Sequence, residues 1–365
     1  MSVVVSGAGL LTGYGAGAGR YWRRLLAGDV VLAAPRRFDA AGFGPGVVAE
    51  CPLRPAGDRA ALARPAMAEA LAAAQLPRLP DRTLVVTVAQ SPVPSAPGEA
   101  LATFSGLDPA LLPLPDAAEH LTLSHACASV AFAMLLGRDW LAAGLADAVV
   151  VVGATVLNPC EYAGMAVVKA LSPGAVRPFD LDRDGTGLGE GAGALLLERG
   201  ATARARGVRP AARLAGGDCR IAPAAGAAAD QDTITACLSA ALGSTTVDYV
   251  HAHATGTPQG DRVELAALDT IGRERGWSGV PVSSHKGAVG HLMQSAGFPA
   301  LVAVLGAMRH GTAPGTAGMV RPMPAPASLM HLPTSRRHRV RSALVNCFGF
   351  GGNTAALVLT AEEDS

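Results

Sequence analysis

Short apolar runs alternate along the chain with longer runs rich in alanine and leucine. The short runs are apolar enough to be strands buried on both faces, and their alternation with helical runs predicts a layered α/β fold. Strands are predicted over residues 3–6, 83–88, 148–152, 192–197, 211–215, 247–252, 281–284, 343–347 and 355–359. Helices are predicted over residues 21–27, 58–74, 128–145, 230–242, 263–271 and 294–309.

Two stretches interrupt this alternation. Residues 90–116 and 310–334 are rich in proline, alanine and glycine and are predicted to be irregular. We interpret them as surface or lid segments, because apolar core patterns resume on both sides of each. The chain has 365 residues, half of them hydrophobic. It is therefore long enough for two domains or for one large duplicated domain.

The charge pattern argues against nucleic-acid binding. Charged residues make up 16% of the chain, and the formal net charge is +1. The densest basic cluster, "SRRHRVR" at 335–341, is short and is interpreted as a solvated loop. Aromatic residues make up only 4%, which leaves few side chains on which bases can stack.

The cysteines indicate a reduced environment. They are widely spaced, with no CxxC pair, so we expect free thiols and neither a disulfide framework nor a metal site. The N-terminal residues lack the basic region of a signal peptide, and the apolar part of residues 290–308 is too short to span a bilayer. We therefore expect a soluble, cytoplasmic protein. The six cysteines are Cys51, Cys127, Cys160, Cys219, Cys237 and Cys347.

One of these thiols stands where a polar stretch becomes apolar, in "TLSHACASVAFAM" at 122–134. A helix is predicted to begin at or just after Cys127, with Ser124 as its cap. A helix N-terminus stabilises a thiolate by about 0.3–2 kcal/mol. Lowering the pKa of a thiol by one unit takes about 1.4 kcal/mol, so the helix could account for much of such a shift. Cys127 is thus a candidate nucleophile with a lowered pKa. The alternative is a small buried side chain, a common place for free cysteine.

Four other stretches carry polar groups or glycines beside predicted strands. "HAHATGTPQGDRVE" places His253 at the carboxyl end of a strand, the edge at which α/β sheets bind ligands. "SSHKGAVGHLMQSAG" carries Lys286 and His291, and "NCFGFGGNTA" separates phenylalanines by glycines. "RPFDLDRDGTGLGEGAGALLLE" is a charged, glycine-rich entry to a strand. Taken singly, each stretch could be structural, with a buried histidine, a surface lysine or an ordinary glycine turn. Taken together, a cysteine at a helix start and two histidines are the groups that acyl transfer requires.

Together these stretches resemble the motifs of β-ketoacyl synthases of the thiolase superfamily, in the branch that elongates chains on acyl carrier proteins. That branch typically reads TAC-S, where this chain has "HACAS". It reads HGTGT and then D-x-x-E, where this chain has "HATGT" with Asp261 and Glu264. It reads K-x-x-x-G-H and N-x-FGFGG, which match Lys286 to His291 and "NCFGFGG". The resemblance runs in order over residues 3–359.

The resemblance implies a five-layered αβαβα thiolase-like fold of two similar halves. We place these halves at residues 1–199 and 200–365, with the site where they meet. The first half would supply Cys127. The second would supply a lysine, two histidines and two phenylalanines, namely Lys286, His253, His291, Phe348 and Phe350.

It also implies a mechanism. Cys127 takes an acyl group from a phosphopantetheine thioester that arrives on an acyl carrier protein, so no bound cofactor is expected. The backbone N–H groups of Cys127 and Phe350 bind the oxyanion. A malonyl thioester then loses carbon dioxide, and His253 and His291 hold the enolate, with Lys286 ordering their surroundings. This implies decarboxylative condensation in type II polyketide or specialised fatty-acyl biosynthesis.

The chain departs from the family pattern at several places. Ala300 stands where relatives usually have a glutamate that pairs with the lysine, so Lys286 needs another partner or lies nearer water. "GGNTA" reverses the usual order of threonine and asparagine, and Ala254 replaces a glycine. The segment before Cys127 is shorter than usual and lacks a glycine-rich turn. These departures indicate a specialised enzyme.

Three other functions are compatible with parts of the sequence. A non-elongating acyltransferase would use Cys127 without decarboxylation. A chain-length-factor-like subunit would share the fold but typically lacks the cysteine. A thiolase would use Cys347 as a base, although "GFGG" fits synthases better. As in relatives, a homodimer or a heterodimer with a similar subunit is expected around "EHLTLSH", with Leu121 and Leu123 at the interface.

Overall fold

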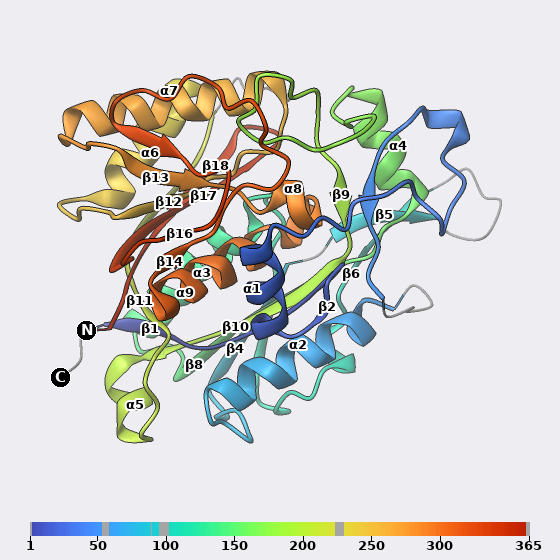
Figure 1. The fold of residues 1–365 in the computed structure, drawn as a ribbon. Helices are drawn as coiled ribbons and strands as arrows, with labels where there is room; N and C mark the ends of the chain where they lie inside the picture. Colours follow the sequence, from blue (N-terminus) through green and yellow to red (C-terminus); the bar gives the residue numbers. More distant parts are fainter. Residues whose placement is uncertain (1, 53–57, 89, 95–101, 223–229, 363–365) are drawn as a thin grey trace.

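The computed structural model describes residues 2–52, 58–88, 90–94, 102–222 and 230–362. Its main feature is a twisted sheet in which β11 and β1 are hydrogen-bonded neighbours near the middle of the strand order (Figure 1). Along the sheet the strands are β15 (Leu329–His331), β13 (Val280–Ser283), β12 (Tyr249–His251), β17 (Ser342–Gly349), β18 (Asn353–Thr360), β11 (Ala212–Ile221), β1 (Val3–Thr12), β10 (Gly191–Arg199), β8 (Ala148–Thr155), β4 (Thr83–Thr87) and β7 (Glu119–Thr122).

The two sides of this sheet repeat one topology. On one side, β1, β10 and β8 are antiparallel, and β8, β4 and β7 are parallel. On the other, β11, β18 and β17 are antiparallel, and β17, β12 and β13 are parallel. The sides are joined by a short antiparallel pairing in which Val4 lies opposite Arg213 and Val5 opposite Ala212. The expected pair of similar halves is therefore visible in the strand order.

Helices form the remaining layers. Helix α2 (Arg59–Ala73) covers the outer face of β1 and β10, and α6 (Gln231–Leu242) and α7 (Pro258–Glu274) cover the other outer face. Helices α3 (Ser129–Ala142) and α9 (Gly297–His310) each contact strands of both sides and so lie between them. Helix α1 (Ala18–Ala27) packs against β1 and α9. This is the five-layered αβαβα arrangement.

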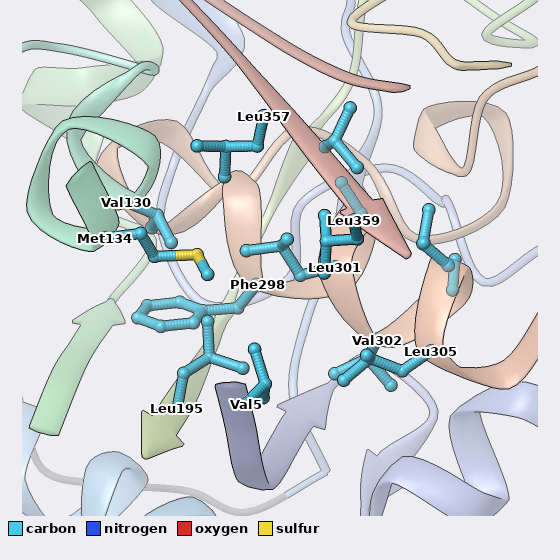
Figure 2. Packing of buried hydrophobic residues seen from close by; sticks show 14 of the residues in the cluster. Val5, Val130, Met134, Leu195, Phe298, Leu301, Val302, Leu305, Leu357 and Leu359 are labelled. Atoms are coloured by element: carbon cyan, nitrogen blue, oxygen red, sulfur yellow. The ribbon is translucent and has the colours of Figure 1, made fainter. Parts of the chain in front are cut away.

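The central layer is held by close packing around Phe298 of α9. Figure 2 shows its ring between Met134 of α3 and Leu195 of β10. A Cβ atom at Gly193 would lie 2.2 Å from a ring carbon of Phe298, so glycine there lets the helix approach the strand. Burying a ring of this size stabilises the fold by about 1.5–3 kcal/mol. The packing fixes α9 and, with it, the segment from Lys286 to His291 that precedes it.

All nine predicted strands and all six predicted helices are present, with shifted ends. Three predictions need correction. The predicted irregular segment 90–116 contains the hairpin strands β5 (Gln90–Pro94) and β6 (Ala102–Gly106). Helix α3 begins at Ser129 with Ala128 as its N-cap, so Ser124 is not the cap. Residues 310–334, also predicted to be irregular, include the short strands β14 (Thr312–Ala313) and β15.

The other elements are short. They are β2 (Gly15–Ala16), β3 (Val48–Ala49), β9 (Leu188–Gly189), β16 (Arg336–Arg337), α4 (Pro159–Val167), α5 (Gly200–Ala205) and α8 (Lys286–Val289).

No helix in the described ranges combines the length and the apolar character needed to cross a membrane.

Candidate active site

Cys127 lies in the turn between β7 and α3, and this turn is braced by Ser129. The Ser129 hydroxyl donates to the carbonyl of Ala126 over 2.6 Å and accepts from the amide of His125 over 2.8 Å. Ala126 has a φ of +47°, which is the left-handed region. This conformation reverses the chain immediately before the nucleophile. The thiol is buried, with 8% of the residue exposed, and lines a cavity.

The expected lowering of the thiol pKa is wrong. Burial raises the pKa of Cys127 to about 12, and the positive charge of Lys286 offsets only part of this effect. The free-energy cost of removing the thiolate from water is larger than the stabilisation that a nearby helix end and one cation provide. The resting form is therefore the neutral thiol.

His253 and His291 lie at the same cavity with their rings fixed. Nδ1 of His253 accepts from the amide of Phe348 over 3.2 Å, and Nδ1 of His291 accepts from the amide of Met293 over 3.0 Å. A neutral imidazole whose Nδ1 accepts carries its proton on Nε2. The two ring centroids are 5.5 Å apart, with the planes at 78°. The site thus holds two N–H donors of defined tautomer.

Both rings are neutral. Burial lowers the pKa of His253 and of His291 well below the usual range, and the charge of Lys286 lowers both further. Neutral donors remain hydrogen-bond donors across the physiological pH range without needing a counter-ion. No cluster of His, Cys, Asp or Glu side chains within the described ranges has the arrangement of a metal site.

The "HATGT" loop is held by two buried carboxylates of α7. Glu264 accepts from the amides of His253 and Ala254 over 2.8 and 2.7 Å, and from Nδ2 of Asn346 over 2.8 Å. Asp261 accepts from the amides of Thr255 and Gly256 over 3.0 and 3.1 Å. Burial raises the pKa of Asp261 to about 7. These bonds fix the backbone that carries His253.

Lys286 lies close to the backbone of His253. It is fully inside the protein, with 2% exposed, and its Nζ donates to the carbonyl of His253. Burial lowers the pKa of Lys286, and the neighbouring carboxylate of Glu264 opposes that shift. Of the two alternatives predicted for Lys286, the first is confirmed, because the carbonyl of His253 is its other partner. The second, in which the lysine lies nearer water, is wrong. Ala300 is buried in the apolar core of α9.

A second pair of histidines, for which the sequence motifs predict no role, lies next to Lys286. Nε2 of His251 is 2.9 Å from Nδ1 of His285, and the rings stack with centroids 5.2 Å apart. Nδ1 of His251 also bonds the hydroxyl of Tyr249 over 2.8 Å. Both histidines are fully buried. The available signal was their position, two residues before His253 and one before Lys286.

One cavity of about 420 Å³ brings the predicted groups together. Phe348 is buried and its ring centroid lies 5.4 Å from that of His253, whereas Phe350 is 41% exposed. Cys347 is buried in the core, as expected of a small structural residue. The lining includes Cys127, His253, His291, Phe348 and Phe350, with Lys286 outside it.

The chain matches two family models. Residues 117–203 match the β-ketoacyl synthase N-terminal domain, and residues 210–319 match the β-ketoacyl synthase C-terminal domain. Among solved structures it resembles the ishigamide ketosynthase/chain length factor, with a TM-score of 0.86, 27% identity and 99% of each chain covered.

Curated relatives agree with these matches. The mitochondrial 3-oxoacyl-[acyl-carrier-protein] synthase of Arabidopsis thaliana is 37% identical over 65% of this chain and 55% of its own length. The matches to synthases of Rhizobium meliloti and Streptomyces halstedii span 59% and 60% of those proteins. The oxytetracycline polyketide putative beta-ketoacyl synthase 1 of Streptomyces rimosus is 30% identical over 98% of this chain and 96% of its own length. The chain belongs to the β-ketoacyl synthase family.

Proposed function

We propose that the protein is a β-ketoacyl synthase that transfers an acyl group to Cys127 and then condenses it with a malonyl thioester on an acyl carrier protein. The observation that carries this proposal is one cavity lined by a thiol and by two neutral imidazoles whose protons are on Nε2. A thiol alone suffices for acyl transfer. Two fixed donors beside it are what an enolate oxygen requires.

In the first half-reaction, Sγ of Cys127 attacks the carbonyl of a carrier-bound thioester. The carbon–sulfur bond to phosphopantetheine breaks, and the departing thiolate receives the proton lost by Cys127. The oxyanion of the tetrahedral intermediate is assigned to the backbone N–H groups of Cys127 and Phe350. One donor of this kind typically contributes about 2.7–4 kcal/mol.

In the second half-reaction, a malonyl thioester loses carbon dioxide. The enolate oxygen accepts from Nε2 of His253 and of His291, and the enolate carbon attacks the acyl carbonyl on Cys127. The carbon–sulfur bond to Cys127 then breaks, the 3-oxoacyl product stays on the carrier protein, and the released thiolate takes up a proton from water. Because both rings are already neutral donors, no proton transfer precedes this step. Lys286 holds the carbonyl of His253, so its role is to position that ring.

We assign the substrate class and partners by relationship. One relative is named a 3-oxoacyl-[acyl-carrier-protein] synthase, and two others are named as ketoacyl synthases of polyketide synthesis. We propose the same carrier-bound thioesters here, in a cytoplasmic setting. We place the division between the halves at residues 199 and 200, where β10 ends. This division is supported by the repeated strand order.

We also propose a dimer, with an identical or a similar subunit, through β7. This strand ends the sheet, and its four residues are all exposed. An edge strand in this position offers unpaired backbone groups to a second copy. The structural neighbours include a ketosynthase/chain length factor.

The test is intact mass spectrometry of the wild-type protein with a panel of acyl carrier thioesters, followed by a malonyl carrier thioester. We expect acyl loading at Cys127, then release of carbon dioxide and a carrier-bound 3-oxoacyl product. Cys127→Ala should not load, and Cys347→Ala should load normally as the matched control. An adduct on Cys347 or Cys160 would refute the assignment. Loading without decarboxylation would establish the acyltransferase alternative.

A further inference from the structure

Two residues that depart from the family pattern in separate motifs meet beside the nucleophile. His125 stands in "HACAS" where the pattern has threonine, and Asn353 stands in "GGNTA" where it has threonine. In the structure Nδ1 of His125 lies 2.9 Å from Oδ1 of Asn353. Nδ2 of Asn353 in turn donates to the carbonyl of Phe350 over 2.7 Å. A continuous chain of hydrogen bonds therefore runs between two segments. One is the nucleophile turn, residues 123–128 between β7 and α3, and the other is the glycine-rich loop, residues 349–352 before β18.

The nucleophile turn requires such support. Ala126 adopts the left-handed conformation, which is strained for a residue with a Cβ. Strained residues persist where the surroundings over-determine their conformation. The ring of His125 stacks on Phe132 of α3, with centroids 4.0 Å apart and planes at 10°. This stacking fixes the plane of the ring and leaves Nδ1 directed at Asn353.

The glycine-rich loop requires it as well. Gly351 and Gly352 both have left-handed φ values, +75° and +74°. A chain of glycines has many conformations to lose on ordering. Phe350 is 41% exposed, so burial of its ring does little to anchor the loop. The bond from Asn353 to the carbonyl of Phe350 holds the residue whose amide is assigned to the oxyanion.

We propose that His125 and Asn353 are a pair of positioning residues that lock the nucleophile turn to the glycine-rich loop. Their bond sets the distance between the amides of Cys127 and Phe350, and so makes the oxyanion site ready before the thioester arrives. The pair joins the two halves of the fold, because His125 precedes α3 and Asn353 begins β18. This inference rests on the proposed function.

The test uses His125→Phe, Asn353→Ala and the double variant, with Ser124→Ala as an exposed control in the same turn. His125→Phe keeps an aromatic ring on Phe132 and removes both ring nitrogens, including the Nδ1 that bonds Asn353. We expect each single variant to acylate Cys127 about tenfold more slowly than wild type, as loss of one such bond implies. The double variant should be no slower than the slower single variant. Alkylation by iodoacetamide, which forms no oxyanion, should stay within twofold in all of them.

Hydrogen exchange of residues 346–354 gives a readout that does not depend on activity. We expect faster exchange in both single variants and no further increase in the double variant. Unchanged acylation and exchange in the single variants would overturn the inference, as would multiplied effects in the double variant. A parallel loss of alkylation would show a general structural role and would also overturn it. If wild type accepts no thioester, the proposed function fails, and the exchange pattern still decides the inference.

Discussion

The amide of Phe348 donates to Nδ1 of His253. The sheet explains this contact, because β12 and β17 are parallel neighbours with His251 opposite Val345. His253 and Phe348 follow these two paired residues in the chain. Neighbouring parallel strands deliver their following residues to one edge. The bond leaves the proton of His253 on Nε2, and the amide of Met293 does the same for His291. The site is therefore arranged to donate two hydrogen bonds rather than to remove a proton.

The raised pKa of Cys127 predicts a specific pH dependence. The folded value of about 12 lies above the ordinary thiol value of 9.0, so the thiolate fraction rises with pH throughout the range in which the protein is handled. Iodoacetamide alkylation of Cys127 should increase about tenfold per pH unit from pH 7 to 10, because only the thiolate reacts. Peptide mapping after timed exposure measures this rate. A plateau beginning below pH 8 would show instead that the site stabilises the thiolate.

Glu264→Gln should loosen the "HATGT" loop. The carboxylate accepts from two backbone amides and from Asn346, and glutamine would turn one acceptor oxygen into a donor. We expect a loss of about 1–3 kcal/mol in the free energy of unfolding, measured in urea. Condensation should fall together with stability, because His253 is carried by this loop. Glu274→Gln, on the exposed face of the same helix, is the control and should change neither quantity.

Gly349→Ala should slow acylation. A Cβ atom at this position would lie 3.0 Å from the amide nitrogen of Cys127 and 3.0 Å from the Cβ of Ala126. The glycine-rich loop and the nucleophile turn must then separate, which moves the two assigned oxyanion donors apart. A misplacement of this kind typically costs about 10²-fold in rate. Gly164→Ala, in α4 with open space around it, should load acyl groups at the wild-type rate.

Leu121→Asp should disrupt the proposed dimer. Leu121 lies on β7 and is 39% exposed in the single chain, although it is a large apolar residue. A charge placed on an edge strand opposes pairing with a second copy. Light scattering at micromolar concentration should show a dimer for wild type and a monomer for the variant. Val320→Asp, at a position that is 73% exposed, should leave the mass unchanged. A monomeric wild type would remove this proposal.

The sequence predicted nine of the eleven strands along the main sheet and six of the nine α-helices in the described residues, because buried strands and helices carry strong apolar patterns. It did not predict β7 from its pattern, since all four residues of that edge strand are exposed. Helix α4 was missed even though its start carries two usual signals. The side chain of Asn158 accepts from the amide of Glu161 over 3.0 Å, and Pro159 occupies the first turn.

Side-chain environments were harder to predict than elements. The raised pKa of Cys127 depends on burial by segments far apart in the chain, which a helix-start argument omits. The His251–His285 pair forms because β12 and β13 are neighbours, with His251 opposite Ser283. Strand order of this kind is not contained in local spacing. The contact between His125 and Asn353 has the same origin, since it joins residues 228 positions apart.

His291→Ala separates condensation from acyl transfer. Nδ1 of His291 is held by Met293, so the ring supplies one of the two donors assigned to the enolate. Removing that donor should slow carbon dioxide release from malonyl thioester by about 10²–10³-fold. Acylation of Cys127 should change much less, because its oxyanion is assigned to backbone N–H groups that the substitution leaves in place. Both rates are measured on the same preparation, with His253→Ala as the parallel variant and His310→Ala, on the last residue of α9, as the control. Equal losses of loading and of decarboxylation would contradict the division of labour between the backbone donors and the histidines.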